Sequence, residues 1–229
     1  MNELALFAGA GGGLLGTQQL GLKTICAIEL DWHCRCLLVK RQNERHLHES
    51  FPIWDDVCTF DGRPWRGRVD IVSGGFPCQA FSRAARGRNT ADNLWPEMQR
   101  IVADVSPRYV FAENVSAKAI EDAASDLSKM DYKTNMLSLS AKDLGADHIR
   151  ERYWLLAYTD DKSQLRSQIN AKVAKFAEFC EGIWTNAPAE SRMDDGLSSR
   201  MEQYAATGNG QVPAVAAAAL WALANAKDQ

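Results

Sequence analysis

One cysteine of this chain stands in a context suited to covalent chemistry. The stretch "GGFPCQAFS", residues 74–82, places Cys78 directly behind Pro77, among glycines and small polar residues. A thiol in such a loop can pack against the protein, bind a metal or act as a nucleophile. The nucleophilic form is the thiolate, so Cys78 would need positive or hydrogen-bonding neighbours at neutral pH.

An acid and two arginines further along the chain are of the types that such chemistry needs. Glu113 lies near the end of the apolar stretch "RYVFAENV", and "HIRER" contains Arg150 and Arg152 two residues apart. Residues two apart on a strand share one face, and arginine offers a fixed fork of donors. A glutamate donates a proton only if its pKa is raised or the proton is shared. Taken alone, each of these residues could equally be an exposed surface charge.

A glycine-rich turn indicates a nucleoside cofactor. "FAGAGGGLLG" carries Gly11, Gly13 and Gly16 in the spacing G-x-G-x-x-G between an expected strand and an expected helix, and Glu29 ends the next strand. Glycine lets the backbone approach a ligand, and an acid in this place accepts hydrogen bonds from ribose hydroxyls. The spacing alone does not choose between NAD, FAD and S-adenosylmethionine.

Cysteine and histidine usage does not favour a metal site. The six cysteines form no C-x-x-C pair, so we expect reduced thiols rather than a disulfide framework. Several possible ligands lie close together in the sequence: His33, Cys34, Cys36, His46 and His48. Their spacing matches no established zinc pattern, and we expect no bound metal.

Length and charge place further bounds on the protein. A chain of 229 residues is long enough for one sizeable α/β domain with a small appendage. The net charge of −3 argues against binding of polyanions by the whole surface but permits a local basic patch. The sequence contains no apolar run of membrane-spanning length and no signal peptide, so we expect a cytoplasmic protein, by default a monomer.

Alternating strands and helices are expected to position the reactive residues. Apolar runs typical of strands cover residues 3–7, 23–31, 68–75, 108–115, 132–140 and 152–158. Helical segments between them predict an α/β fold with a mostly parallel, doubly wound sheet. Ligands of such sheets bind beyond the carboxyl ends of the strands, where the glycine turn, Cys78 and Glu113 all fall. One crevice is therefore expected to collect them.

Taken together, the motifs resemble those of the DNA (cytosine-5) methyltransferases. "LFAGAGGGLLG", "AIELD", "DDV", "GGFPCQAFS", "ENV", "RER" and "GNGQVP" occur in the order seen in that family. The resemblance implies a Rossmann-like S-adenosylmethionine-dependent methyltransferase fold, S-adenosylmethionine as cofactor and double-stranded DNA as partner. The implied substrate is a cytosine flipped out of the duplex, because its carbon 6 cannot be reached inside the stack. His148 departs from the pattern, since glutamine is usual there.

The resemblance also implies roles for the catalytic residues. A Cys78 thiolate adding to carbon 6 of cytosine makes carbon 5 enamine-like, so that carbon 5 can attack the sulfonium methyl group. Glu113 would hydrogen-bond the amino group of the base and protonate ring nitrogen 3. Arg150 is expected at the cytosine and Arg152 beside Glu113, while Asn114 is expected to tie the loop together.

Cofactor-binding and DNA-binding residues follow from the same resemblance. Those assigned to the cofactor are Phe7, Gly9, Gly11, Gly12, Glu29, Asp56, Val57, Pro77 and Asn209. Those assigned to DNA are Gln79, Ser82, Arg83, Arg86 and Arg88, in a loop that would close over the strand. Two ordinary alternatives stay open: an aromatic such as Phe7 commonly packs in the core, and the arginine-rich stretch could be a plain polar surface loop.

A long target-recognition region is usual in the family after the position of Tyr158. Only about 35 residues, 159–193, are available before the resemblance resumes, too few for an independent core. We expect residues 1–158 to form the catalytic and cofactor-binding domain, 159–193 a reduced target-recognition segment of helix and loop, and 194–229 a C-terminal segment returning to the catalytic domain. A helix carrying Lys162, Arg166, Lys172 and Lys175 is expected to dock on DNA, with a short or relaxed recognition site.

Three alternatives to a DNA cytosine-5 methyltransferase remain open from sequence. A NAD- or FAD-binding oxidoreductase would use the glycine turn but leave Cys78, Glu113 and the paired arginines without a task. A non-catalytic relative that binds DNA or senses cofactor is a second possibility, and a methyltransferase acting on RNA is a third. The biological role, such as restriction-modification, phage evasion or regulation, is not given by these residues.

Overall fold

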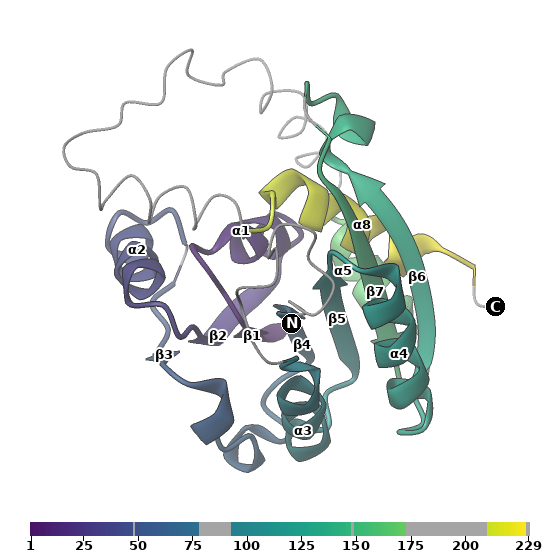
Figure 1. The fold of residues 1–229 in the computed structure, drawn as a ribbon, viewed down its shortest axis with the longest axis horizontal. Coiled ribbons are helices and arrows are strands. Elements are labelled where there is room, and N and C mark those ends of the chain that lie inside the picture. Colours follow the sequence, from purple (N-terminus) through teal and green to yellow (C-terminus); the bar gives the residue numbers. More distant parts are fainter. Residues whose placement is uncertain (48, 78–92, 148, 173–209, 228–229) are drawn as a thin grey trace, which may run out of the picture.

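The fold is built on one seven-stranded sheet with helices on both faces (Figure 1). A computed structural model describes residues 1–47, 49–77, 93–147, 149–172 and 210–227 of the chain. The strands are β1 (Asn2–Leu6), β2 (Lys23–Ile28), β3 (Ile53–Trp54), β4 (Ile71–Gly75), β5 (Tyr109–Asn114), β6 (Lys133–Ser140) and β7 (Glu151–Tyr158). Their order is β3-β2-β1-β4-β5-β7-β6; β7 pairs antiparallel with β5 and β6, and the other pairs are parallel. The predicted α/β fold with a mostly parallel sheet is confirmed.

Six helices cover the two faces of the sheet among the described residues. They are α1 (Gly12–Gln19), α2 (Trp32–Asn43), α3 (Trp95–Val105), α4 (Ala117–Ser128), α5 (Ser163–Asn170) and α8 (Pro213–Asn225). The apolar residues of α3 and α4 pack with those of the central strands on one face, while α1, α2, α5 and α8 contribute to the cores of the other face. Within α4, Ile120, Ala123 and Leu127 recur at helical spacing and are buried, as an amphipathic helix requires.

The expected site lies where the strand order reverses, so that successive strands are added on the opposite side of β1. From β1 the chain moves outward to β2 and β3, and then returns to β4 on the other side of β1. In open α/β sheets, ligands bind beyond the carboxyl ends of strands at such a switch point. The ends of β1 and β4 therefore mark the expected crevice, and the end of β5 lies next to them.

A buried carboxylate near the start of β1 joins four elements beneath this crevice. Glu3 is 1% exposed and accepts hydrogen bonds from Ser73 Oγ at 2.7 Å, Thr17 Oγ1 at 2.9 Å and Thr24 Oγ1 at 2.8 Å. Burial raises the pKa of Glu3, and the three hydroxyl groups partly offset that rise. The sequence pattern described this strand as an apolar run and gave no indication of the network.

Two basic residues at helix α5, which were expected to dock on DNA, instead contact the C-terminal end of α8. Lys162 is 1% exposed, and its Nζ donates to the carbonyl oxygens of Leu223 at 3.3 Å and Ala226 at 2.7 Å. Arg166 donates from Nε to the carbonyl oxygen of Ala224 at 3.1 Å. Both cations therefore serve the C-terminal end of α8, where free carbonyls and the helix dipole favour positive charge. The expected DNA contact is wrong for Lys162, whose ammonium group is buried.

The same helix changes how the sequence after Tyr158 should be divided. Leu165 and Ile169 of α5 are fully buried in the core that also contains α8. The described beginning of the segment 159–193 is thus part of the main body rather than a separate recognition element, while residues 173–193 lie outside the described residues. No helix of the described ranges is long and apolar enough to cross a membrane.

Candidate active site and cofactor pocket

The glycine turn follows β1 in a left-handed backbone conformation. Phe7, Gly9 and Gly11 have φ values of 53°, 54° and 86°. Phe7 is a non-glycine residue in this conformation, which is uncommon and typical of functional turns, and its side chain packs against the core beneath α3 and α4. At Gly9 the position of a side chain is open space, so the turn offers bare backbone to a ligand there.

Other glycines of the motif face protein rather than open space. A Cβ at Gly12 would collide with the carbonyl oxygen of Gln211, and a Cβ at Gly16 would lie 2.5 Å from the carbonyl oxygen of Pro213. These glycines allow the segment before α8 to lie directly on α1, as Figure 1 shows for the two helices. Close packing of protein, which the spacing did not reveal, is therefore one reason for glycine at these positions.

The acid at the end of the next strand lies against this turn, as predicted. The Glu29 carboxylate accepts from the backbone N–H groups of Gly9 at 2.6 Å and Asp31 at 2.8 Å. Burial raises the pKa of Glu29, whereas the two N–H donors lower it. Each carboxylate oxygen can accept more than one hydrogen bond, so Glu29 retains capacity for a ligand.

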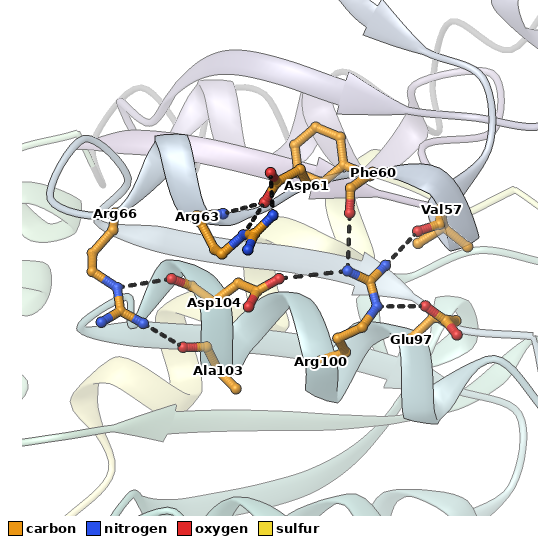
Figure 2. A network of polar contacts seen from close by, with 9 residues as sticks. All are labelled: Val57, Phe60, Asp61, Arg63, Arg66, Glu97, Arg100, Ala103 and Asp104. Carbon is orange, nitrogen blue, oxygen red and sulfur yellow. Dashed lines mark hydrogen bonds and ion pairs between the residues drawn. The ribbon is translucent and has the colours of Figure 1, made fainter.

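A second turn, after β3, carries Asp56 and Val57. Asp56 caps the short helix Val57–Thr59 by accepting from the N–H of Cys58 at 2.9 Å. Figure 2 shows how Arg100 of α3 holds this turn, donating from Nη2 to the carbonyl of Val57 at 2.8 Å and from Nη1 to the carbonyl of Phe60 at 2.9 Å. Arg100 also pairs with Glu97 through Nε at 2.8 Å. No sequence motif had singled out Arg100.

Glu113, the penultimate residue of β5, is a buried acid with a partner at each carboxylate oxygen. It is 7% exposed; Arg152 Nε lies 3.0 Å from Oε1, and Gln211 Nε2 donates to Oε2 at 3.2 Å. Burial raises the pKa of Glu113, and Arg152, Gln211 and Arg150 act in the opposite direction. Because Glu113 pairs with Trp154 across the sheet, Arg152 is its diagonal neighbour on the same face of β7. Arg152 therefore lies beside Glu113, as expected.

Arg150 lies just before β7 and contacts the C-terminal segment. Its Nη2 donates to the carbonyl oxygen of Gly210 at 2.6 Å, and its backbone N–H donates to Ser140 Oγ at 3.2 Å. Burial and the nearby charge of Arg152 lower the pKa of Arg150, while Glu113 raises it. The two arginines therefore have different partners: Arg152 contacts Glu113 from within β7, whereas Arg150 precedes β7 and contacts Gly210.

Asn114 links the carboxyl ends of β4 and β5 by hydrogen bonds. Its Nδ2 donates to the carbonyl of Phe76 at 2.8 Å, and its Oδ1 accepts from the N–H of Ser116 at 3.0 Å. This confirms the expected linking role. Pro77 was assigned to the cofactor; its carbonyl accepts from the N–H of Leu94 at 3.3 Å, a bond that leaves its second lone pair free.

A small cavity of about 40 Å³ joins the glycine turn to Glu113. Its lining includes Phe7, Gly9, Gly75, Glu113 and Gln211. The carboxyl ends of β1, β4 and β5 therefore share one crevice, as the strand pattern predicted. Several expected site residues lie outside the described residues: Cys78, Gln79, Ser82, Arg83, Arg86, Arg88, His148, Lys175 and Asn209.

Comparisons with known proteins agree with this arrangement. Type II methyltransferase M.Eco47II of Escherichia coli is 39% identical over 54% of this chain and 29% of its own length. Type II methyltransferase M.DsaV of Dactylococcopsis salina is 27% identical over 90% of this chain and 60% of its own. The chain therefore spans less than two thirds of the length of these relatives.

Solved structures show the same fold. A putative DNA modification methyltransferase encoded within an E. coli prophage has a TM-score of 0.53 and 27% identity, covering 69% of this chain and 47% of that one. The Dnmt2 methyltransferase of S. pombe has a TM-score of 0.55 over 87% of this chain and 63% of its own, and its 18% identity supports the fold alone. The family model for the C-5 cytosine-specific DNA methylases matches residues 1–211. The glycine turn and the buried Glu113 line one cavity, as the match to this family model leads one to expect, and the chain belongs to the family of C-5 cytosine-specific DNA methylases.

Proposed function

We propose that this protein transfers a methyl group from S-adenosylmethionine to carbon 5 of a flipped-out cytosine in DNA, through a covalent adduct with Cys78. The observation that carries the proposal is Glu113, a buried acid held by Arg152 at the end of β5 and joined to the glycine turn by one cavity. Burial raises the pKa of this carboxyl, which favours a retained proton. That proton is available for ring nitrogen 3 while the thiolate adds to carbon 6. Carbon 5 then takes the methyl group and S-adenosylhomocysteine leaves; in the final elimination the carbon 5 proton is lost and the Cys78 thiolate is expelled, which gives 5-methylcytosine.

The described residues fit S-adenosylmethionine, which supplies an electrophilic methyl group when bound. The open space at Gly9 lets the backbone approach a ligand closely, and Glu29 beside it has acceptor capacity for ribose hydroxyls. Asp56 and the N–H of Val57 would meet the adenine edge, on a turn that Arg100 holds in place. Asn209 would close the pocket, and Gly11 and Gly12 would contribute backbone to it.

In the reacting site, we assign Arg150 to the cytosine and Arg152 to the orientation of Glu113. The contact at 3.0 Å fixes Oε1 of the carboxyl, while Oε2, which accepts from Gln211 Nε2, has a second lone pair with which to meet the base. This use of Glu113, Arg150 and Arg152 is what separates the proposal from an NAD- or FAD-binding oxidoreductase. Family membership agrees, because the matched family is one of DNA methylases.

DNA binding is assigned to the loop after Cys78, by the residues Gln79, Ser82, Arg83, Arg86 and Arg88. Because Lys162 is buried and both Lys162 and Arg166 donate to carbonyl oxygens at the C-terminal end of α8, we leave them out of the DNA surface. We retain the proposal of a short or relaxed recognition site, read by a monomer. Methylation mapping on random-sequence DNA tests this: modification spread over many contexts is expected, and an absolute requirement for six or more base pairs would contradict it.

Methyl transfer itself is tested with S-adenosylmethionine labelled in the methyl group. The protein is incubated with duplex DNA or with an RNA of matched sequence, and the nucleic acid is hydrolysed to identify the labelled base. We expect 5-methylcytosine from DNA, and none with Cys78→Ala. Label in RNA alone would favour the RNA-directed relative, and label on the amino nitrogen of cytosine would contradict the proposed chemistry.

A further inference from the structure

The side chain of Gln211 lies in a space left open by two glycines, Gly13 of α1 and Gly75 of β4. A Cβ at Gly13 of α1 would collide with Gln211 Oε1, and a Cβ at Gly75 of β4 would lie 3.0 Å from its Nε2 and 2.5 Å from Glu113 Oε2. The amide of Gln211 thus lies between α1, β4 and β5. There its Nε2 donates to Glu113 Oε2 at 3.2 Å.

The backbone around Gln211 is fixed by separate contacts. Its carbonyl oxygen lies on Gly12, where a Cβ would collide with it, and the carbonyl of Gly210 accepts from Arg150 Nη2 at 2.6 Å. Two residues later Pro213 begins α8, which is buried against the rest of the fold. The position of the Gln211 side chain is therefore set by contacts on both sides of it rather than by its bond to Glu113 alone.

The two partners of Glu113 differ in what they can offer it. Arginine only donates hydrogen bonds, whereas a glutamine amide can donate through Nε2 or accept through Oε1. A carboxyl that gives up and regains a proton during a reaction therefore finds in Gln211 a partner for both of its forms. Among the described residues, the charged groups facing Glu113 are Arg152 on β7 and Arg150 before it.

We infer, on the basis of the proposed methyl transfer, that Gln211 is a positioning residue for Glu113. Its side chain holds the catalytic carboxyl through Oε2, while its backbone lies on the glycine turn. The C-terminal segment thereby connects the cofactor-binding turn to the acid that acts on the base. Gln211 stands in the "GNGQVP" motif, in which sequence reasoning had selected only Asn209.

Kinetics of two variants of similar size test this inference. Gln211→Met removes the amide and keeps the volume, so we expect kcat to fall about tenfold, the usual order for a hydrogen bond to a charged group, with a smaller change in the KM for S-adenosylmethionine. Without the donor, the carboxylate of Glu113 is less stable and its pKa rises. The alkaline limb of the kcat profile, set by loss of the Glu113 proton, should therefore move to higher pH.

Gln211→Glu places a second carboxyl in the same space. When protonated it can donate as glutamine does, and when ionised it repels Glu113. We expect activity near that of the wild type at low pH. Once the second carboxyl ionises, the donor to Glu113 is lost and kcat should fall about as in Gln211→Met, while the added negative charge raises the pKa of Glu113 and moves the alkaline limb to higher pH. Gln19→Met, at the opposite end of α1, is the matched control and should leave kcat and the pH profile unchanged.

The outcomes separate this inference from the proposed function. If the wild type transfers no methyl group, the proposed function fails before Gln211 is in question. If the wild type is active and Gln211→Met keeps both its kcat and its pH profile, the positioning role is wrong. An increase in KM alone, with an unmoved alkaline limb, would also overturn it, because that result indicates only a structural part in the cofactor pocket.

Discussion

At the scale of single residues, two buried glutamates show how partners decide what a carboxyl can do. Glu3 and Glu113 are both almost inaccessible, and burial raises the pKa of each. Glu3 accepts from three hydroxyl groups in the interior, whereas Glu113 meets Arg152 and borders the cavity beside the glycine turn. The first joins elements of the fold, and the second lies where the proposed reaction needs an acid.

The carboxyl of Glu3 makes stability depend on pH in a defined direction. Its pKa is raised from 4.5 in the folded state, so the unfolded chain loses this proton first as pH increases. The contribution of Glu3 is therefore greatest below about pH 4.5 and is lost as pH rises through the folded-state pKa. Urea denaturation of the wild type and Glu3→Gln from pH 4.5 to 8 measures it. We expect the stability difference, wild type minus variant, to fall as pH rises; a constant or rising difference would show that the folded pKa is not raised.

At the scale of elements, the contact between α1 and α8 brings the two ends of the sequence together at the site. α8 is rich in alanine, and residues 214–220 are all buried, as expected of a helix that is apolar on every side. Small side chains on α8 and glycines on α1 allow the two backbones to approach closely. The turn that would bind the cofactor is thus supported by residues about two hundred positions later in the chain.

Gly16→Ala should weaken this contact. The added Cβ would lie 2.5 Å from the carbonyl oxygen of Pro213, and we expect a loss of about 2 kcal/mol in the free energy of unfolding, typical of overpacking. Helix propensity alone predicts the opposite sign, because alanine is the better helix former. Chemical denaturation distinguishes the two, with Gln19→Ala on the same helix as control. A variant as stable as the wild type would show that α8 can shift at little cost.

Helix α3 supports, through Arg100, the second turn that we assign to the cofactor. Arg100→Met removes two hydrogen bonds to the carbonyls of Val57 and Phe60, so the turn bearing Asp56 should loosen. We expect the Kd for S-adenosylhomocysteine, measured by calorimetry, to rise about tenfold. Arg63→Met, in the same region of Figure 2, removes only an exposed pair with Asp61 and should leave the Kd unchanged. Equal affinities of both variants would remove Arg100 from the account of the pocket.

The parts of the fold and of the site that could be predicted are those whose residues form a recognisable sequence pattern. β1, β4, β5 and β7 were predicted because buried strands form continuous apolar runs, but β3 has only two residues and was missed. Lys162 looked like a surface cation because its burial depends on α8, which lies far along the chain. Arg100 and Gln211 were missed for a related reason: Arg100 holds backbone carbonyls, and Gln211 contacts elements remote in sequence.

At the scale of the whole molecule, the described residues form a methyltransferase body to which both ends of the chain contribute. The glycine turn, the exits of β4 and β5, and the residues before α8 surround one crevice. The resemblance, rather than the residue spacing, had placed Arg152 beside Glu113, and the structure agrees. The chain spans 29% and 60% of the length of the two relatives compared. The proposed reaction is therefore argued from the residues of the site and not from the whole length of those relatives.

The most direct test of methyl transfer through a cysteine adduct uses duplex DNA that contains 5-fluorocytosine. Fluorine at carbon 5 blocks the final elimination, so the bond between Cys78 and carbon 6 should persist after methyl transfer. With S-adenosylmethionine labelled in the methyl group, we predict a labelled protein–DNA complex that resists denaturation and is absent for Cys78→Ser. The account is contradicted if the wild type forms no such complex, or if the complex still forms with Cys78→Ser.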